Sequence, residues 1–185
     1  MHLSSELGIA RSTLRTALIE LEKDDLVERT PYSSWAVPNL TPQTVWEVYT
    51  LRAAFEGMAA RLVASNLTQA ARDDLLDAFA GLEEAESSSA GSDRIEAALR
   101  FHTTIVEHSG HHRLIRQYRI LRDKIEWIYR WSEDRWPQRV SLPAWHRPVL
   151  DAILSRAPEA AETAIRLIAE TSLDNDLATL EPEDA

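Results

Sequence analysis

The sequence contains no cysteine, and this absence excludes a disulfide framework and any metal site built from thiolates. Long apolar runs are missing as well. No stretch approaches the roughly 18 residues that a membrane-spanning helix needs, and Met1 leads directly into a polar segment rather than a signal peptide. We therefore expect a soluble, cytoplasmic protein with one or two domains in its 185 residues.

Positive charge is also scarce. The 20 lysines and arginines are outnumbered by 30 aspartates and glutamates, which gives a formal net charge of −10. Since phosphate binding needs local positive charge, this balance argues against a general affinity for nucleic acid. It leaves room for one small basic face, because Arg11, Arg15, Lys23 and Arg29 fall within one segment.

That segment has the pattern of a winged helix-turn-helix, which we place at residues 1–39. A short helical segment ends at Leu7, Gly8 supplies a tight turn, and a second helix is expected from about Arg11 to Lys23. Alternating residues at 26–29 and 35–37 predict a two-stranded wing. The second helix should have one core face, because its apolar residues recur every three or four positions: Leu14, Ala17, Leu18 and Leu21.

Side chains at the start of this second helix are of the types that contact DNA. Arginine offers a bidentate fork for guanine or phosphate, and serine and threonine hydroxyls suit phosphate oxygens. The alternative is that these side chains are merely solvated. The candidate DNA-binding residues, including one from the wing, are Arg11, Ser12, Thr13, Arg15 and Arg29.

The remainder, residues 40–180, has the pattern of a six-helix antiparallel bundle with short connections, so the fold class is mostly α. Threonines at 41 and 68 are expected to cap two of the helices. The expected helices cover about 41–64, 68–85, 93–108, 112–131, 143–155 and 158–177.

Two parts of the sequence resemble the GntR family of transcriptional regulators. Residues 7–27 resemble the family's recognition helix, and the matching positions are Arg11, Arg15, Ala17, Leu18, Leu21, Glu22, Leu26 and Val27. The second half resembles the FadR-type (FCD) sensor domain, and its six expected helices fit the VanR-like branch. The similar segments are Leu51–Glu56 with Ala59–Leu62, Phe101–His102 with His108–Gly110, and His146–Ile153.

The resemblance implies a homodimeric regulator, in our reading a repressor rather than an enzyme, with operator DNA and a small effector as partners. The effector of such proteins is often a carboxylate, sometimes held through a divalent metal such as zinc, nickel or manganese. The implied effector-binding residues are Arg52, His102, Arg130 and His146, of which the two histidines are also candidate metal ligands. For the histidines the alternative is a satisfied core role, and for Arg52 it is an ion pair with Glu56.

This sequence departs from the family pattern at the metal site. The family places an aspartate four residues before the first histidine and a further histidine on the last helix, and here these positions are Ala98 and Ile168. Two imidazoles alone hold a divalent ion poorly. Either an organic effector is bound directly, or a rearranged site recruits Glu96 or Glu107.

A second departure concerns the beginning of the DNA-binding module. GntR winged helices have a helix and a short strand before the segment that begins here, so either the true start lies upstream or the DNA-binding module is truncated and lacks its first helix. A partial module would cover Leu14 and Leu18 poorly. The alternative function is therefore an effector-binding helical bundle without DNA-binding activity. Tryptophans at 127, 131, 136 and 145 predict core or dimer packing, or an aromatic wall for a ring-bearing effector.

Overall fold

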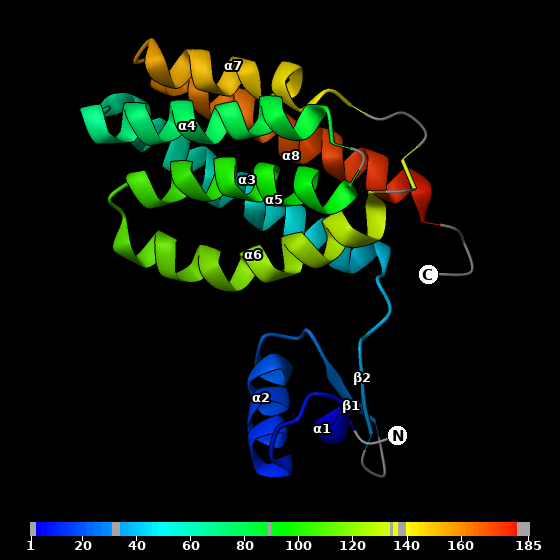
Figure 1. Ribbon diagram of the computed structural model, residues 1–185. Helices are drawn as coiled ribbons and strands as arrows, with labels where there is room; N and C mark the ends of the chain where they lie inside the picture. The colour runs from blue at the N-terminus through cyan, green and yellow to red at the C-terminus, as the bar shows by residue number, and fades with distance from the viewer. Residues whose placement is uncertain (1–2, 31–33, 89, 134, 137–139, 181–185) are drawn as a thin grey trace. The chain divides into compact units, whose positions relative to one another are not determined.

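The computed structural model describes residues 3–30, 34–88, 90–133, 135–136 and 140–180. Within these residues the chain is mostly helical, and it divides into two compact units, residues 1–40 and 41–185. The elements of both units are labelled in Figure 1. None of the helices in the described part combines the length and apolar character that a membrane crossing requires.

The first unit consists of two helices and a two-stranded sheet. Helix α1 spans Leu3–Glu6 and α2 spans Arg11–Lys23, while β1 (Glu28–Thr30) pairs antiparallel with β2 (Ser34–Ala36). Gly8 lies between the helices with φ of +64°, a left-handed conformation that glycine adopts without strain. The expected strands overlap the observed ones, and the turn at 31–33 lies outside the described residues.

The apolar face expected on α2 is only partly covered. Leu14 and Leu18 are half-buried, Ala17 and Leu21 are exposed, and no described side chain of α2 is fully buried. Hydrophobic burial therefore contributes less to this helix than the sequence pattern predicts.

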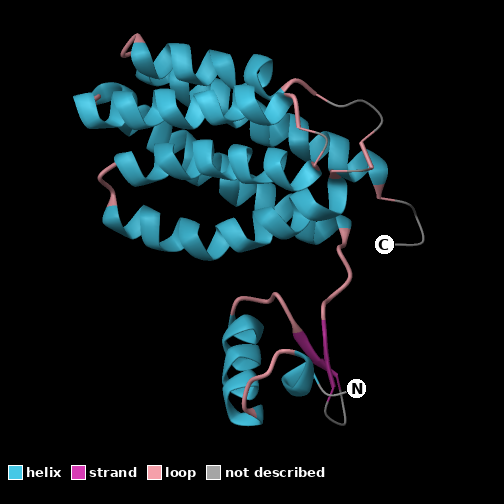
Figure 2. Cartoon of the chain, viewed as in Figure 1, coloured by secondary structure: helices cyan, strands magenta, loops and turns pink. Residues whose placement is uncertain are grey.

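The second unit contains six helices among its described residues, and Figure 2 shows short loops after the first, third and fifth of them. Each begins and ends within two residues of its expected position. The predicted caps are confirmed, because the hydroxyl oxygens of Thr41 and Thr68 each accept a backbone N–H at 3.1 Å. The helices are α3 (Pro42–Ser65), α4 (Gln69–Glu86), α5 (Gly91–His108), α6 (His112–Ser132), α7 (Leu142–Leu154) and α8 (Pro158–Thr179).

Helix α3 occupies the centre of this unit. It packs along α8 and also contacts α5, α6 and α7, while α4 packs against α5 and α7. The face of α3 that meets these helices is buried, whereas Leu51 and Met58 elsewhere on the helix are 48% and 45% exposed. Helix α3 buries Arg52 and Glu56 together with its apolar residues, and these two side chains begin the site described next.

Candidate functional site

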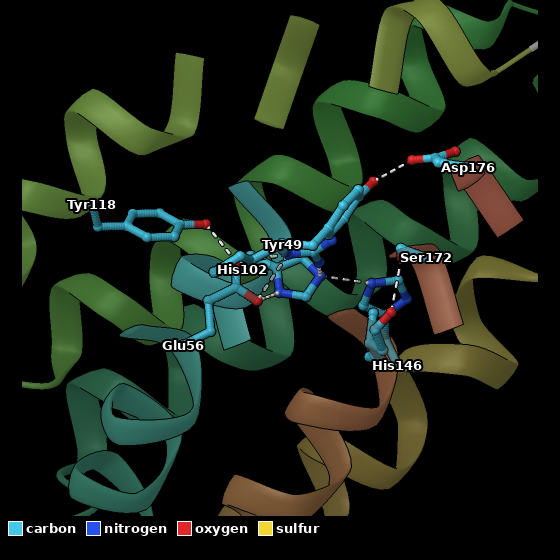
Figure 3. Close-up of polar contacts among 9 residues, drawn as sticks. Tyr49, Glu56, His102, Tyr118, His146, Ser172 and Asp176 are labelled. Carbon is cyan, nitrogen blue, oxygen red and sulfur yellow. Dashed lines mark hydrogen bonds and ion pairs between the residues drawn. The ribbon is translucent and has the colours of Figure 1, made fainter. Parts of the chain in front are cut away.

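A cluster of buried polar side chains lies inside the second unit. Arg52 and Glu56 come from α3, His102 from α5, Tyr118 from α6 and His146 from α7, and each is at most 1% exposed. Figure 3 shows Glu56, His102 and His146 arranged in a row, with Tyr118 approaching the carboxylate from the other side. Four helices thus contribute to one set of polar contacts, which we call the buried polar cluster.

The carboxylate of Glu56 is the anionic centre of the cluster. Helical spacing of four residues lets Arg52 donate from Nε to both carboxylate oxygens at 3.1 and 3.2 Å. The Tyr118 hydroxyl donates to Oε1 at 2.8 Å. Burial by itself would raise the pKa of Glu56, but the charge of Arg52 and the proximity of His102 lower this pKa to about 2. Glu56 is therefore ionised at neutral pH.

Each of the two histidines places Nδ1 next to an oxygen atom, by a hydrogen bond in His146 and by a short contact without hydrogen-bond geometry in His102, and this favours a proton on both Nδ1 atoms. Nδ1 of His146 donates to the carbonyl oxygen of Leu142 at 2.7 Å, and Nδ1 of His102 lies 2.9 Å from Oε2 of Glu56. Both Nε2 atoms then carry lone pairs, and they face each other at 3.1 Å. Burial is the main cause that lowers the pKa of both rings, for His146 to about 3, so both are neutral at pH 7.

Arg52 supplies the hydrogen that this junction would otherwise lack. Its Nη2 lies 3.0 Å from Nε2 of His102 and, as a guanidinium, must be the donor. The guanidinium carbon also lies 5.5 Å from the ring centroid of Tyr49 and 5.3 Å from that of Tyr129. One buried cation is thus held by a carboxylate, an imidazole and two aromatic rings.

A cavity of about 200 Å³ lies next to this cluster. It is lined by residues of α5, α6 and α7 and by Glu133, Trp136 and Val140, which lie between α6 and α7. His146 belongs to both the cluster and the cavity lining. The other polar and aromatic residues of the lining are Arg94, Tyr129, Ser132, Glu133, Trp136 and Trp145, and the apolar ones include Ile95, Ala98 and Leu142.

The arginine in the cavity wall lies beside two carboxylates. Arg94 is 4% exposed, and its Nη1 donates to Glu86 at 3.0 Å. Its Nη2 donates to the carbonyl oxygen of Val140 at 2.7 Å, and its Nε lies 3.3 Å from Glu133. Behind Trp136, Asp176 accepts hydrogen bonds from Trp136 Nε1 and from the Tyr49 hydroxyl, the latter at 2.7 Å.

The predicted effector-binding residues take different positions. His146 lines the cavity, while His102 lies behind it and Arg52 lies deeper, paired with Glu56 as the alternative interpretation had it. Arg130 does not line the cavity, because it lies on the exposed side of α6 and donates to Glu126 at 2.7 Å. Arg94 is the arginine in the wall, and no motif or spacing in the sequence identifies it.

Of the four tryptophans considered for an aromatic wall, two line the cavity. Trp136 and Trp145 meet edge to face with centroids 5.7 Å apart. Trp127 and Trp131 are half-buried on α6 and are not part of the lining.

The predicted DNA-binding side chains are all on the surface of the first unit. Arg11, Ser12, Thr13 and Arg15 are exposed at the start of α2. The two arginines form no ion pair with any side chain that the structure describes. In β1, Arg29 is exposed too, with its guanidinium carbon 5.9 Å from the ring centroid of Trp35 on the paired strand.

Comparison with known families agrees with this arrangement. Residues 47–171 match the FCD domain, which is more than half of the chain. The chain belongs to the FCD-domain family of GntR-type transcriptional regulators. Its cluster and cavity therefore lie within the FCD domain, and its relatives are transcriptional regulators rather than enzymes.

Two curated relatives are similar over most of the chain. A "Probable D-xylose utilization operon transcriptional repressor" of Paenarthrobacter nicotinovorans is 28% identical over 168 residues, which cover 89% of this chain and 72% of the relative. The HTH-type transcriptional regulator YdhC of Bacillus subtilis strain 168 is 25% identical over 166 residues, which cover 86% of this chain and 72% of the relative.

Solved structures share the fold of this FCD protein at lower sequence identity. McbR/YncC of E. coli has a TM-score of 0.81 at 19% identity, covering 93% of this chain and 82% of that one. A GntR family member from Pseudomonas syringae pv. tomato str. DC3000 has a TM-score of 0.65 at 21% identity, covering 94% and 72%. At these identities the likeness concerns the fold alone.

The donor set of this FCD domain does not fit the divalent metal that the resemblance implies. Among the described residues, no group of three or more histidine, aspartate or glutamate side chains converges as metal ligands require. Ala98 contributes only a methyl group to the cavity, and the Arg52 guanidinium already uses the lone pair of His102. Glu96 and Glu107 cannot serve as replacement metal ligands here, because both are exposed on α5.

Proposed function

We propose that this chain is a repressor that reads operator DNA as a homodimer through the start of α2 and releases it when a small organic effector binds in the FCD domain. The exposure of Arg11 and Arg15 without ionic partners is the observation that carries the DNA-binding part. The repressor role is supported by the relative named for a D-xylose utilization operon.

The polarity of α2 supports the assignment of its first turns to DNA. Arg11 and Arg15 are four residues apart and so share a face, and Ser12 and Thr13 add two exposed hydroxyls between them. The far end of the helix is acidic, and there Glu20 is bonded to Lys23 at 2.7 Å. In addition, the N-terminal end of a helix carries partial positive charge, which favours phosphate.

In this proposal β1 and β2 form the wing, and Arg29 contacts the DNA backbone beside the recognition helix. The cation has no carboxylate partner among the described residues. Its contact with Trp35 across the strand pair would keep the guanidinium extended along the wing.

Effector control requires that the ligand favours one arrangement of the dimer over another. Each half-site would be read by one α2, so a change in the spacing of the two helices would reduce the fit to the operator. A coupling free energy of about 1–3 kcal/mol between effector and DNA is typical of such systems. The resemblance implies an effector that is often a carboxylate, and the charges around the cavity bear directly on that expectation.

DNA binding is tested by fluorescence anisotropy with the intergenic DNA next to the gene, over a range of salt concentrations. Replacing Arg11 or Arg15 by alanine should weaken specific binding by about 1–3 kcal/mol if the side chain reads a base, or lower the salt slope by about one if it contacts phosphate. Arg116→Ala is the matched control, because Arg116 is an exposed arginine of α6. Equal effects of all three substitutions would contradict the proposal.

A second candidate function is an effector-binding bundle without DNA-binding activity. It is favoured by the apolar surface of the first unit, where Leu3 is 45% and Leu7 58% exposed, with Ile19 and Leu21 at 38% and 39%. A loosely packed first unit would hold the side chains of Arg11 and Arg15 less rigidly. Failure of the full chain to bind the intergenic DNA, together with retained ligand binding, would establish this candidate.

A further inference from the structure

We infer that the cavity beside His146 binds an uncharged, hydroxyl-rich ring of the monosaccharide class directly, without a metal and without a carboxylate on the ligand. This inference depends on the proposed role of the FCD domain as an effector sensor and specifies the ligand class of its cavity. Three features of the cavity carry it: its charge pairing, its hydrogen-bond acceptors and its aromatic walls.

The charge pairing disfavours an anion. A carboxylate effector needs a cation with free donors, and Arg94 is the cation among the described lining residues. Its Nη1 and Nη2 donate to Glu86 and to the Val140 carbonyl oxygen, and its Nε makes no hydrogen bond but lies 3.3 Å from the Glu133 carboxylate. An incoming carboxylate would therefore displace existing bonds and meet two carboxylates at once. Uncompensated burial of like charges is strongly unfavourable.

The same pairing disfavours a cation. Glu86 and Glu133 already share Arg94, and Asp176 accepts hydrogen bonds from Tyr49 and Trp136. A buried ammonium group without a free counter-ion carries a large desolvation cost. A neutral ligand avoids both costs, because it requires hydrogen bonds and no new ion pair.

The polar groups of the lining suit hydroxyls. His146 contributes a neutral ring to the lining, and both of its nitrogens already face partners, the Leu142 carbonyl oxygen and Nε2 of His102. The hydroxyls of the lining are those of Ser132 and Tyr129. Ser132 Oγ donates to the carbonyl oxygen of Tyr129 at 3.4 Å, and its lone pairs can still accept from a ligand O–H group.

The walls and volume suit a single ring. Trp136 and Trp145 present aromatic surface to the cavity, against which the C–H face of a pyranose can pack. A cavity of about 150 Å³ is known to hold benzene, so about 200 Å³ accommodates one ring with small substituents. The combination of aromatic walls and a few polar groups is typical of small-molecule sites.

A ligand series that differs at one position tests the charge class. D-Xylose, D-glucose and D-glucuronate share one ring and carry hydrogen, a hydroxymethyl group or a carboxylate at the same carbon, and D-glucosamine adds an amine to the glucose ring. Binding to the full chain is measured without DNA by calorimetry and tryptophan fluorescence. We expect saturable binding of at least one neutral sugar, at least tenfold tighter than D-glucuronate and D-glucosamine.

Substitutions connect that binding to this cavity. Ala98→Leu adds bulk to the cavity wall and should weaken sugar binding at least tenfold, while Ala70→Leu on the exposed face of α4 should leave it unchanged. Ser132→Ala is a second, smaller change that removes a hydroxyl. A thermal unfolding curve for each variant shows that the FCD domain is folded.

Tighter binding of D-glucuronate or D-glucosamine than of both neutral sugars would overturn the inference, and so would the absence of saturable binding by any sugar. Sugar binding that Ala98→Leu leaves intact would overturn the location. Loss of DNA binding affects the proposed function alone, because the ligand titration uses no DNA. A chain that binds neutral sugar but no operator would be the effector-binding bundle described above.

Discussion

Replacing Glu56 by glutamine removes one negative charge from the centre of the buried polar cluster and keeps the shape of the side chain. Arg52 then remains fully buried with an imidazole and two aromatic rings for partners, and no carboxylate within bonding distance among the described residues. Tyr118 and His102 also lose an ionised acceptor. The variant therefore isolates the contribution of a single charge.

Two independent arguments give the size of the effect. Removing one partner of a buried ion pair costs about 3–5 kcal/mol. The fall of the Glu56 pKa from 4.5 to about 2, caused by Arg52 and His102 against the opposing effect of burial, corresponds to roughly 3 kcal/mol. For a unit of this size we expect the midpoint of thermal unfolding to fall by roughly 10 °C.

The assay is denaturant unfolding followed by tryptophan fluorescence, since five of the six tryptophans lie in the second unit. Glu83→Gln is the control, because it breaks an exposed pair with Arg147 and should cost less than about 1 kcal/mol. Arg52→Met with Glu56→Gln should cost less than the sum of the single changes. A Glu56→Gln variant within 1 kcal/mol of wild type, or additive effects, would refute the reasoning.

Three further predictions concern protonation, metal binding and helix propensity. Burial lowers the folded-state pKa of His146 to about 3, so its contribution to stability is complete above pH 6.5 and is lost as the pH falls toward 3. From this ring alone we expect the free energy of unfolding to be about 1.4 kcal/mol lower at pH 5.5 than at pH 7.5, as measured by urea unfolding in EDTA. The His146→Gln variant should show a smaller change of stability with pH. The same pH dependence in the variant and in the wild type would count against this role of His146. Wild-type protein should bind zinc weakly in calorimetry. The double variant Ala98→Asp with Ile168→His should bind zinc at least tenfold more tightly, because it adds two ligands. An unchanged zinc affinity would show that these two positions do not face His102 and His146. Gly81→Ala in α4 should raise stability by about 0.5–1 kcal/mol, since the added Cβ would meet only Arg100 at 3.6 Å; a loss of stability in thermal unfolding would show that the position is more crowded than described.

The helices were predictable because their signals are local. A threonine cap followed by residues of helical periodicity places the start of α3 and α4, and the caps at Thr41 and Thr68 form the expected hydrogen bonds. The pattern on α2 identifies a face for packing, and the partial coverage of Leu14 and Leu18 agrees with what a partial module would give. Periodicity reports which face a helix offers for packing, and Leu21 shows that it does not report how much of that face is covered.

The site was predictable only where a motif or a helical spacing identifies it. His102 and His146 stand in recognisable segments, and the pairing of Arg52 with Glu56 follows from a spacing of four. The remaining partners are distant in sequence. Tyr118 is 62 residues from the carboxylate it contacts, and Tyr49 is 127 residues from Asp176.

Arg94 illustrates the limit of sequence reasoning about charge. Arg130 and Arg94 are both arginines on amphipathic helices, and the sequence gives no reason to prefer either for the cavity. The difference is that Arg94 faces two carboxylates from other segments, which stabilise its burial, whereas Arg130 finds Glu126 one turn away on the surface. Tertiary pairing, not propensity, decides which arginine is inside.

The energetics of the buried polar cluster favour a functional role for its position. A buried ion pair with two neutral histidines is no more stabilising than well-packed apolar side chains of the same volume, and most of the surrounding core is apolar. The cluster nevertheless spans four helices, and His146 connects it to the cavity. A ligand packed against His146 in the cavity would touch the ring that faces His102, and His102 in turn accepts a hydrogen bond from Arg52 on α3. Since α3 begins at Pro42 and the first unit ends at Leu40, the effector control that we propose would act through this helix.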